Sequence, residues 1–180
     1  MKLRNLGQMM MAAALTIGAA AAAIPGDADL AKSVRHEVLM YSRYTMWDDI
    51  NFRVNKGHVE LLGEVTQPYK KQDLGKIVQS IPGVASVTNE LKVLPLSSFD
   101  DRLRLQVARA IFNDPTLSRY AMGAVPSIHI IVDNGRVMLT GAVATETEKQ
   151  IAGIRASGAG LGFGPVVNNL SVDQPAKKKS

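Results

Sequence analysis

A nine-residue pattern occurs twice in this chain, and the duplication limits the possible folds more than any other feature. The pattern reads GHVELLGEV at residues 57–65 and GRVMLTGAV at residues 135–143. The positions that are identical are Gly57, Val59, Leu61, Gly63 and Val65 in the first copy, and Gly135, Val137, Leu139, Gly141 and Val143 in the second. Either one chemical motif is used twice or one small fold is built twice, and the surrounding residues decide between these alternatives.

Each copy of the pattern belongs to a predicted β-hairpin. The segments INFRV at 50–54 and IHIIV at 128–132 place apolar residues at every second position, which is typical of a strand with one buried face. The turns NKG and DNG follow these strands. Gly57 and Gly135 are therefore interpreted as turn residues that supply the positive φ of a tight hairpin.

The second glycine of each copy, Gly63 or Gly141, falls inside the return strand. A glycine at such a place usually marks a bulge or the close approach of another backbone. We expect a helix lying across the sheet to provide that approach.

An amphipathic helix is predicted before each hairpin. Apolar residues recur there at every fourth position, namely Leu30, Val34 and Val38 in the first copy and Leu103, Val107 and Ile111 in the second. Acidic residues stand at the predicted helix starts, where a negative charge interacts favourably with the positive end of the helix dipole and stabilises the helix. These residues are Asp27, Asp29, Asp100 and Asp101.

A second helix and a last strand are predicted after each hairpin. In the first copy the helix begins near Pro68, and in the second Thr145 and Glu148 have the spacing of a capping box. The last strands read VTNELKV at 87–93 and VVNNLSV at 166–172. Each copy therefore has the order helix, strand, strand, helix, strand.

This order predicts an α+β fold of two tandem small αββαβ domains, at residues 27–95 and 98–175. Each domain is expected to have a three-stranded mixed sheet covered by two helices. The linker LPLSS at 94–98 is long enough for a hinge. Units this small are marginally stable alone, and packing of one copy on the other would relieve this.

The N-terminal residues have the features of an export signal. Lys2 and Arg4 precede an uncharged stretch rich in Ala, Met and Leu, and small residues offer cleavage after residue 23 or after residue 28. An uncleaved anchor is the alternative, although the stretch is weakly apolar for a membrane span. We expect residues 1–23 to be a cleavable signal.

Charge and cysteine content argue against several classes of protein. The chain has a net charge of +5, but residues 24–97 carry nine basic and nine acidic side chains, and residues 98–175 carry seven of each. The excess lies in the signal and in a basic tail at 176–180, so no basic face for nucleic acid is expected. Because the sequence has no cysteine, we expect no disulfide, thiolate metal site or lipid-modified cysteine.

No arrangement of residues points to catalysis or to a cofactor. The histidines His36, His58 and His129 lie on a predicted helix, beside a turn and in a strand, without the spacing of a metal site. Asp48 and Asp49 are adjacent, and adjacent residues of an extended segment point in opposite directions, which favours a loop role over an acid–base pair. We therefore expect no enzyme activity, no metal and no cofactor.

A glycine-rich run, GAGLGFG, occupies residues 158–164. It follows a predicted helix and precedes a strand, whereas a phosphate-binding glycine loop follows a strand and precedes a helix. The run is interpreted as a flexible loop. A mobile contact loop that presents Leu161 and Phe163 is the alternative.

These features together resemble the BON domain family, named for bacterial osmotically induced and nodulation proteins. The resemblance rests on the pattern G-x-V-x-L-x-G-x-V, on the helix before it, and on a closing V-x-N-x-L-x-V. The closing pattern is formed by Val87, Asn89, Leu91 and Val93 and by Val166, Asn168, Leu170 and Val172. The resemblance covers nearly all residues after the signal, and the chain departs from the family at the run 158–164.

The resemblance carries expectations about function. Members with two such domains are envelope proteins of Gram-negative bacteria, implicated in phospholipid binding, membrane integrity and osmotic stress, and are not known as enzymes. Together with the export signal, this implies a periplasmic protein, and the absence of a cysteine favours a form without a lipid anchor.

The two copies differ most on the outer face of the helix before each hairpin. In the first copy this face carries Lys32, Arg35, His36 and Leu39; the matching positions in the second are Leu105, Ala108, Arg109 and Phe112, with Arg102 and Arg104 nearby. Apolar residues beside arginine suit an interfacial helix. Arg102, Leu105, Arg109 and Phe112 are therefore the candidate contacts for an anionic phospholipid or membrane surface, and packing of Leu105 and Phe112 on the first domain is the alternative.

Two functions follow as hypotheses. The first is a non-enzymatic periplasmic binding module that acts at the cell envelope through weak phospholipid or membrane-surface association, in envelope integrity or osmotic stress. The second is a periplasmic stress holdase or assembly factor that binds exported or envelope proteins with the same apolar face. The sequence leaves open the lipid, the client protein, the oligomeric state and the placement of the two domains.

Overall fold

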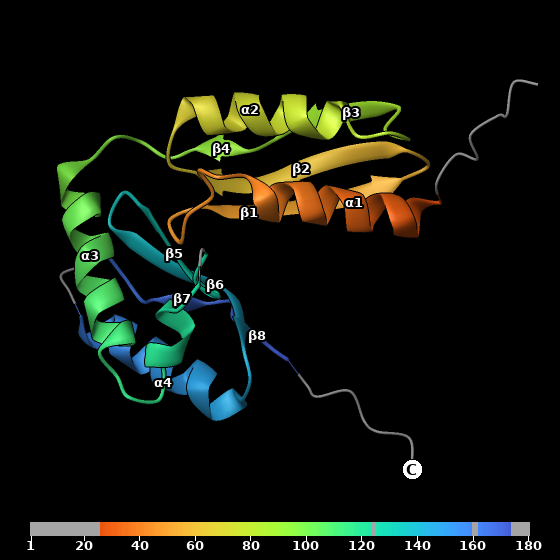
Figure 1. Cartoon of the computed structure of the whole chain (residues 1–180). Helices are drawn as coiled ribbons and strands as arrows, with labels where there is room; N and C mark the ends of the chain where they lie inside the picture. The colour runs from red at the N-terminus through yellow and green to blue at the C-terminus, as the bar shows by residue number, and fades with distance from the viewer. Residues whose placement is uncertain (1–25, 124, 160–161, 174–180) are drawn as a thin grey trace, which may run out of the picture.

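A computed structural model describes residues 26–123, 125–159 and 162–173 (Figure 1). The first domain consists of α1 (Asp27–Met40), β1 (Asp49–Asn55), β2 (His58–Val65), α2 (Pro68–Gln79), β3 (Ser86–Asn89) and β4 (Lys92–Val93). The second consists of α3 (Ser98–Phe112), the 3-10 helix η1 (Ser118–Ala121), β5 (Ile128–Asp133), β6 (Arg136–Val143), α4 (Glu146–Gly158), β7 (Val167–Asn168) and β8 (Ser171–Val172). The predicted signal at 1–23 and basic tail at 176–180 lie outside the described residues.

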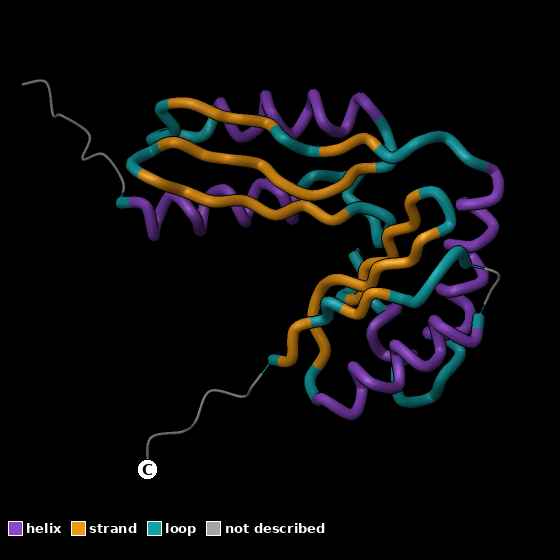
Figure 2. Tube along the Cα trace, turned by 180° about the vertical axis from the view of Figure 1, so that it is seen from behind, coloured by secondary structure: helices purple, strands orange, loops and turns teal. Residues whose placement is uncertain are grey.

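Both domains have the same sheet topology. β1 and β2 form an antiparallel hairpin, and β3 and β4 each pair in parallel with β2. Strands β5 to β8 repeat this arrangement. Two helices cover one face of each sheet, and in Figure 2 the strands of the first domain lie in front of α1 and α2. The predicted α+β fold of two αββαβ domains is confirmed.

Each domain has its own hydrophobic core, and the repeated pattern builds it. The periodic residues of α1 and α3 are buried as predicted, namely Leu30, Val34, Val38, Leu103, Val107 and Ile111. They pack with the valines and the leucine of the pattern, which are Val59, Leu61 and Val65 in one core and Val137, Leu139 and Val143 in the other. The pattern is therefore a folding signal, and one small fold is built twice.

The first glycine of each copy forms a hairpin turn, as predicted. Gly57 has a φ of 78° and Lys56 before it a φ of 49°, and Gly135 and Asn134 have φ values of 74° and 50°. Positive φ at both central residues is the conformation of a type I′ turn. Glycine suits the second of these positions because it adopts a positive φ without strain.

The acidic residues at the helix starts bind these turns. Oxygens of Asp27 accept hydrogen bonds from the amides of Lys56 and Gly57, at 2.7 and 3.0 Å. Asp100 does the same for Asn134 and Gly135, at 2.9 and 2.8 Å. Each helix start is therefore joined to the hairpin turn of its own domain.

The second glycine of each copy does not face a helix, and that prediction is wrong. Gly63 and Gly141 have φ values of 111° and 101°. A Cβ at Gly63 would collide with the carbonyl oxygen of Asp49, and one at Gly141 with that of Ser127. The close backbone therefore belongs to the start of the hairpin's own first strand.

These glycines also explain why the last strand of each domain is interrupted, although the sequence suggests one continuous strand. The pairing of Leu61 with Asn89 and of Glu64 with Lys92 keeps the same register on both sides of the gap. The gap lies opposite Gly63, where the positive φ turns the β2 backbone away from its partner. The second sheet repeats this interruption opposite Gly141.

The asparagine of the closing pattern joins the last strand to the second helix. Nδ2 of Asn89 donates to the carbonyl of Lys71 at 2.7 Å, and its Oδ1 accepts from the amide of Leu91 at 3.3 Å. A Cβ on Gly75 of α2 would lie 2.9 Å from Nδ2, so a larger residue there would push the Asn89 amide out of its present position. In the second domain Asn168, Lys149, Leu170 and Gly153 form the same arrangement.

Candidate functional site

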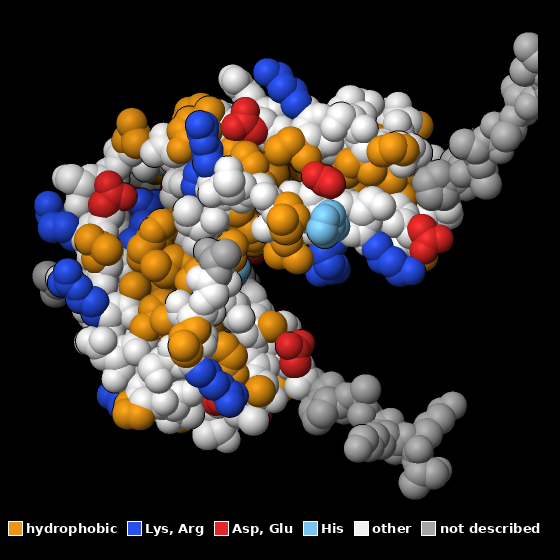
Figure 3. Space-filling view, viewed as in Figure 1, with side chains coloured by type: hydrophobic (Ala, Val, Ile, Leu, Met, Phe, Trp, Pro, Cys, Tyr) orange, Lys and Arg blue, Asp and Glu red, His pale blue; other side chains and the backbone are white. Residues whose placement is uncertain are grey.

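The predicted contact residues lie along α3. Arg102, Leu105 and Arg109 are exposed, and 49% of Leu105 is accessible. Their spacing of three and four residues places them on one side of the helix, which we call the α3 outer face. Figure 3 shows Lys or Arg side chains alternating with hydrophobic ones over this helix. The face therefore combines an uncovered leucine with two arginines.

Phe112, the fourth predicted contact, lies at the edge of this face. It is partly buried and packs against the core of its own domain. The Phe112 side chain is thus more covered than that of Leu105, which is half exposed. Phe112 is less accessible to an external surface than the helical pattern suggests.

Ala108, predicted on this face, and Arg104, predicted near it, are both buried. Arg104 is buried, and its guanidinium donates to Asp101 at 2.5 Å and to the carbonyl of Val132 at 2.7 Å. Ala108 is also buried, within the core of the second domain. The expectation that Ala108 lies on the outer face is wrong, because α3 is covered by α4, β5 and η1 over more of its surface than a narrow stripe.

The junction between the domains is formed by the loop before β1 and by strand β5. The amide of Ile130 donates to the carbonyl of Met46 at 2.8 Å, so this loop binds the free edge of the second sheet. Trp47 from the same loop packs against the second core. Lys92 and Asp133 form an ion pair at 2.6 Å across the junction.

His129 lies at the centre of this junction. Its ring stacks on Tyr44 at a centroid distance of 5.2 Å, and Nδ1 donates to the carbonyl of Asp48 at 2.7 Å. Burial lowers the pKa of His129, and the hydrogen bond to Asp48 and the charge of Asp49 oppose that shift. The neutral imidazole is therefore the form that fits the junction.

The sequence interpretation missed the loop residues of the junction. Tyr41, Tyr44 and Trp47 fall within seven residues in YSRYTMW, the densest group of aromatic side chains in the chain. Aromatic residues concentrated in a loop indicate that the loop packs against something. That signal points to a contact but does not identify the partner.

A cleft of about 700 Å³ opens beside the junction (Figure 3). One wall carries Arg35 and Leu39 of α1 together with the start of β1. The other wall is the face of β5 and β6 that no helix covers, with His129 and Thr140. Its charged residues are of both signs and spread along the rim, so the cleft has no group of side chains that identifies one class of ligand.

A buried ion pair anchors the start of α2. Lys70 Nζ lies 2.6 Å from an oxygen of Asp48, and both side chains are almost fully buried. Asp48 also accepts hydrogen bonds from the amides and hydroxyls of Thr45 and Thr66. The favoured loop role of Asp48 thus takes the form of a buried anchor for a loop, a turn and a helix.

The second domain has an ion pair of reversed charge at the matching place. Glu148 occupies the position in α4 that Lys70 has in α2, and it binds Arg119 at 2.5 Å and the Tyr120 hydroxyl at 2.9 Å. Burial acts to raise the pKa of Glu148, but hydrogen bonds from Tyr120 and Thr145 and the charge of Arg119 outweigh it. The carboxyl pKa therefore lies below its usual range, and the predicted capping box with Thr145 is present.

The other predicted candidates lie apart. His36 is exposed on α1, and His58 contacts Ser86 and Thr88 beside the first turn. Phe163 of the glycine-rich run is exposed and stacks on Phe99 at 5.2 Å, whereas Leu161 lies outside the described residues. In the described part of the chain, no group of three or more His, Cys, Asp or Glu side chains could hold a metal ion.

The comparison with protein families decides the identity of the fold. The BON domain profile matches residues 26–95 and 99–174. The chain belongs to the BON domain family. BON domains are linked to membrane and phospholipid association and are generally non-catalytic. None of the helices between residues 26 and 173 that the structure describes is long and apolar enough to cross a membrane.

Solved structures add little to this BON protein. Two chains of CdsD, a structural protein of the type III secretion system of Chlamydia trachomatis, are similar at 16% identity, with TM-scores of 0.33 and 0.30. Each alignment covers 80% of this chain, which spans 61% and 64% of the two CdsD chains. No curated protein matches the chain.

Proposed function

We propose that this BON protein is a non-enzymatic periplasmic binding module that acts at the cell envelope through weak association with anionic phospholipid, in envelope integrity or osmotic stress. The observation that carries the proposal is the half-exposed Leu105 between Arg102 and Arg109 on the α3 outer face. An apolar side chain flanked by arginines suits a helix that lies at the surface of a bilayer. The junction between the domains runs through β5 and leaves this side of α3 uncovered.

The expected affinity is low. Each basic side chain near an anionic surface contributes about 1 kcal/mol, so two arginines and one leucine give reversible attachment. Salt should weaken it, because exposed charges are screened within about 10 Å at 0.1 M ionic strength. The lysines of the basic tail at 176–180 add further positive charge to this attraction.

The test is flotation of the purified protein with vesicles that contain phosphatidylglycerol and with vesicles of phosphatidylcholine alone. We expect the protein to float only with the anionic vesicles, and Leu105→Asp with Arg109→Glu to abolish flotation. Phe112 is left unchanged because it packs in the core. The control is Lys32→Glu, which makes the same charge change as Arg109→Glu at an exposed position of α1 in the first domain. It should leave flotation intact. Unchanged flotation of the α3 variant would overturn the proposal.

The alternative is a holdase or assembly factor for exported or envelope proteins. It is favoured by exposed apolar side chains at the end of α1, where 55% of Leu39 and 67% of Met40 are accessible. A holdase should suppress aggregation of an unfolded client without any lipid. Lipid-dependent cosedimentation that salt abolishes would instead favour the membrane module.

A further inference from the structure

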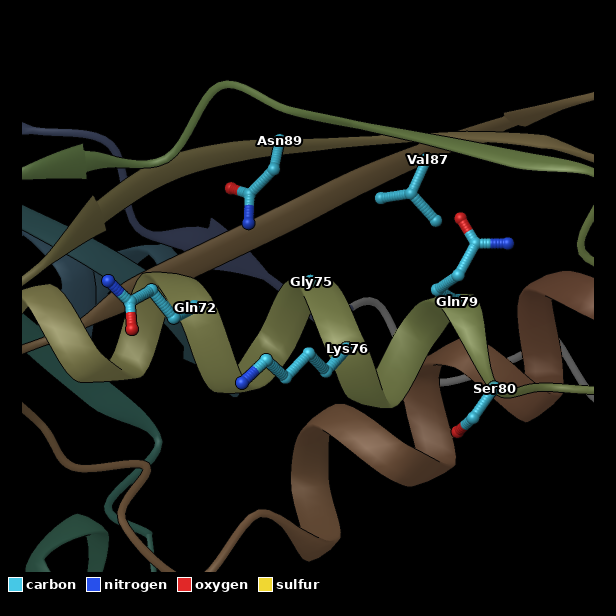
Figure 4. Close-up of a pocket in the computed structure, with 7 residues that line it drawn as sticks. All are labelled: Gln72, Gly75, Lys76, Gln79, Ser80, Val87 and Asn89. Carbon is cyan, nitrogen blue, oxygen red and sulfur yellow. The ribbon is translucent and has the colours of Figure 1, made fainter.

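A groove runs along the outer side of the first domain, between α2 and the edge strand β3 (Figure 4). Its volume is about 610 Å³. In Figure 4, Val87 and Asn89 point from the strand toward the helix, Gly75 lies opposite Asn89, and Gln79 points up beside Val87. Lys76 lies on the helix side of the groove. One wall is therefore a helix and the other is a strand edge.

The strand edge has unpaired backbone groups. β3 pairs with β2 on one side, and among the described residues no strand pairs with it on the other. The amide of Glu90 donates to Leu61, so alternate residues of the strand, including Thr88, face β2. Val87 and Asn89 fall between them and turn their amide and carbonyl groups outward. An exposed edge of this kind is a template for a further strand.

The groove also carries an unpaired cation. Lys76 is exposed and forms none of the ion pairs found among the described residues. In the second domain the same helix position is Ile154, which is 70% exposed, and the matching edge strand β7 has only two residues. The first domain alone thus combines a four-residue edge with a positive charge.

We propose that the groove between α2 and β3 binds an extended polypeptide segment, which adds a strand to the β3 edge and places a carboxylate beside Lys76. Main-chain hydrogen bonds to Val87 and Asn89 supply the affinity, and Lys76 selects acidic segments. The edge is short because the interruption after Asn89 ends it, so only a few residues of the segment pair. This site is separate from the α3 outer face, and each can fail without the other.

The probe is a fluorescein-labelled octapeptide of alternating valine and threonine with one central glutamate. A second peptide has lysine at the centre, and a third is the glutamate peptide with N-methyl groups on alternate amides. Binding to the purified protein is measured by fluorescence polarisation. In ¹⁵N-labelled protein, the amide signals of Val87 and Asn89 report whether the β3 edge is used.

We expect the glutamate peptide to bind about tenfold more tightly than the lysine peptide, and Lys76→Glu to reverse this preference. N-methylation should abolish binding, because it removes the donors that pair with the edge. Ile154→Glu, the matched change in the second domain, should have no effect, and the shifted amides should be those of β3. Absence of binding, binding that survives N-methylation, or equal loss in Ile154→Glu would each overturn the proposal.

Discussion

At the scale of single residues, Asp48 and Lys70 show how burial changes the meaning of a charged side chain. Asp48 follows the aromatic loop and precedes β1, and by sequence it is one of two adjacent acids with no distinctive spacing. In the structure it is fully buried, with Lys70 and the threonines Thr45 and Thr66 as partners. The partners come from three separate segments, so the sequence alone could not bring them together.

We predict that Lys70→Met destabilises the first domain by about 3 kcal/mol or more. The substitution leaves the Asp48 carboxylate buried without a counter-charge, which costs more than the pair itself contributes. Urea unfolding followed by tryptophan fluorescence measures the effect, since Trp47 is the only tryptophan in the chain.

Lys76→Met provides the control for this prediction. It makes the same chemical change on the same helix, but at an exposed side chain without an ion pair. It should therefore leave the midpoint of urea unfolding unchanged. Equal midpoints for Lys70→Met and the wild-type protein would show that the buried pair contributes nothing.

At the scale of elements, most of the fold could be predicted from the sequence. The alternation of β1, the four-residue periodicity of α1 and α3, and the glycine turns identify the elements in their correct order. The sequence did not reveal why Gly75 and Gly153 stand inside helices, because a lone helical glycine usually only lowers helix stability. Their role depends on Asn89 and Asn168, which reach each helix from a strand.

We predict that Asn89→Ala destabilises the first domain by about 1 to 2 kcal/mol. The change removes the donor to the Lys71 carbonyl and the acceptor for the Leu91 amide. Asn168→Ala should cost a similar amount in the second domain, where the contacts have the same lengths.

The double variant tests whether the hydrogen bonds of Asn89 and Asn168 stabilise their domains independently. Because the asparagines lie in different domains, the effects of Asn89→Ala and Asn168→Ala should add within about 0.5 kcal/mol in urea unfolding. A double variant no less stable than either single variant would contradict this interpretation.

At the scale of the whole molecule, the placement of the domains depends on contacts that leave little trace in the sequence. The junction uses a main-chain hydrogen bond between Ile130 and Met46 and a ring stack between Tyr44 and His129. Backbone groups are common to every residue, so their pairing across domains cannot be read from residue types. The α3 outer face leaves a clearer trace in the sequence, because the helical pattern alone separates Leu105 from the core. The pattern does not indicate that Arg104 and Ala108 are buried.

We predict that mild acid loosens this junction. The pKa of His129 lies below its ordinary value of 6.5 because the ring is buried, although the hydrogen bond to Asp48 and the charge of Asp49 oppose this shift. A lowered pKa in the packed state means that the open state takes up the proton first, so the junction weakens as the pH falls from about 6.5 toward that lowered value.

Small-angle X-ray scattering and Trp47 fluorescence between pH 7 and pH 5 can measure this opening. His129→Asn should remove the pH dependence, because the asparagine Nδ2 stands where Nδ1 donates to the Asp48 carbonyl and the amide does not titrate. The carboxyls of Asp114 and Glu148, whose pKa values lie below their usual range, titrate at lower pH. An acid response that persists in His129→Asn would assign the opening to another group.

The charges of the Asp48–Lys70 and Arg119–Glu148 pairs are reversed between the domains, which disfavours pairing of elements from different copies during folding. The copies are similar enough that α2 could dock on the second sheet, or α4 on the first, while both domains are forming. Such an exchange would place Glu148 against the buried Asp48 carboxylate and Lys70 beside the exposed Arg119, so like charges would meet at both helix starts. Neighbouring domains of related sequence are prone to misassembly of this kind. The opposite charges of the two pairs therefore favour docking of each helix on the sheet of its own domain.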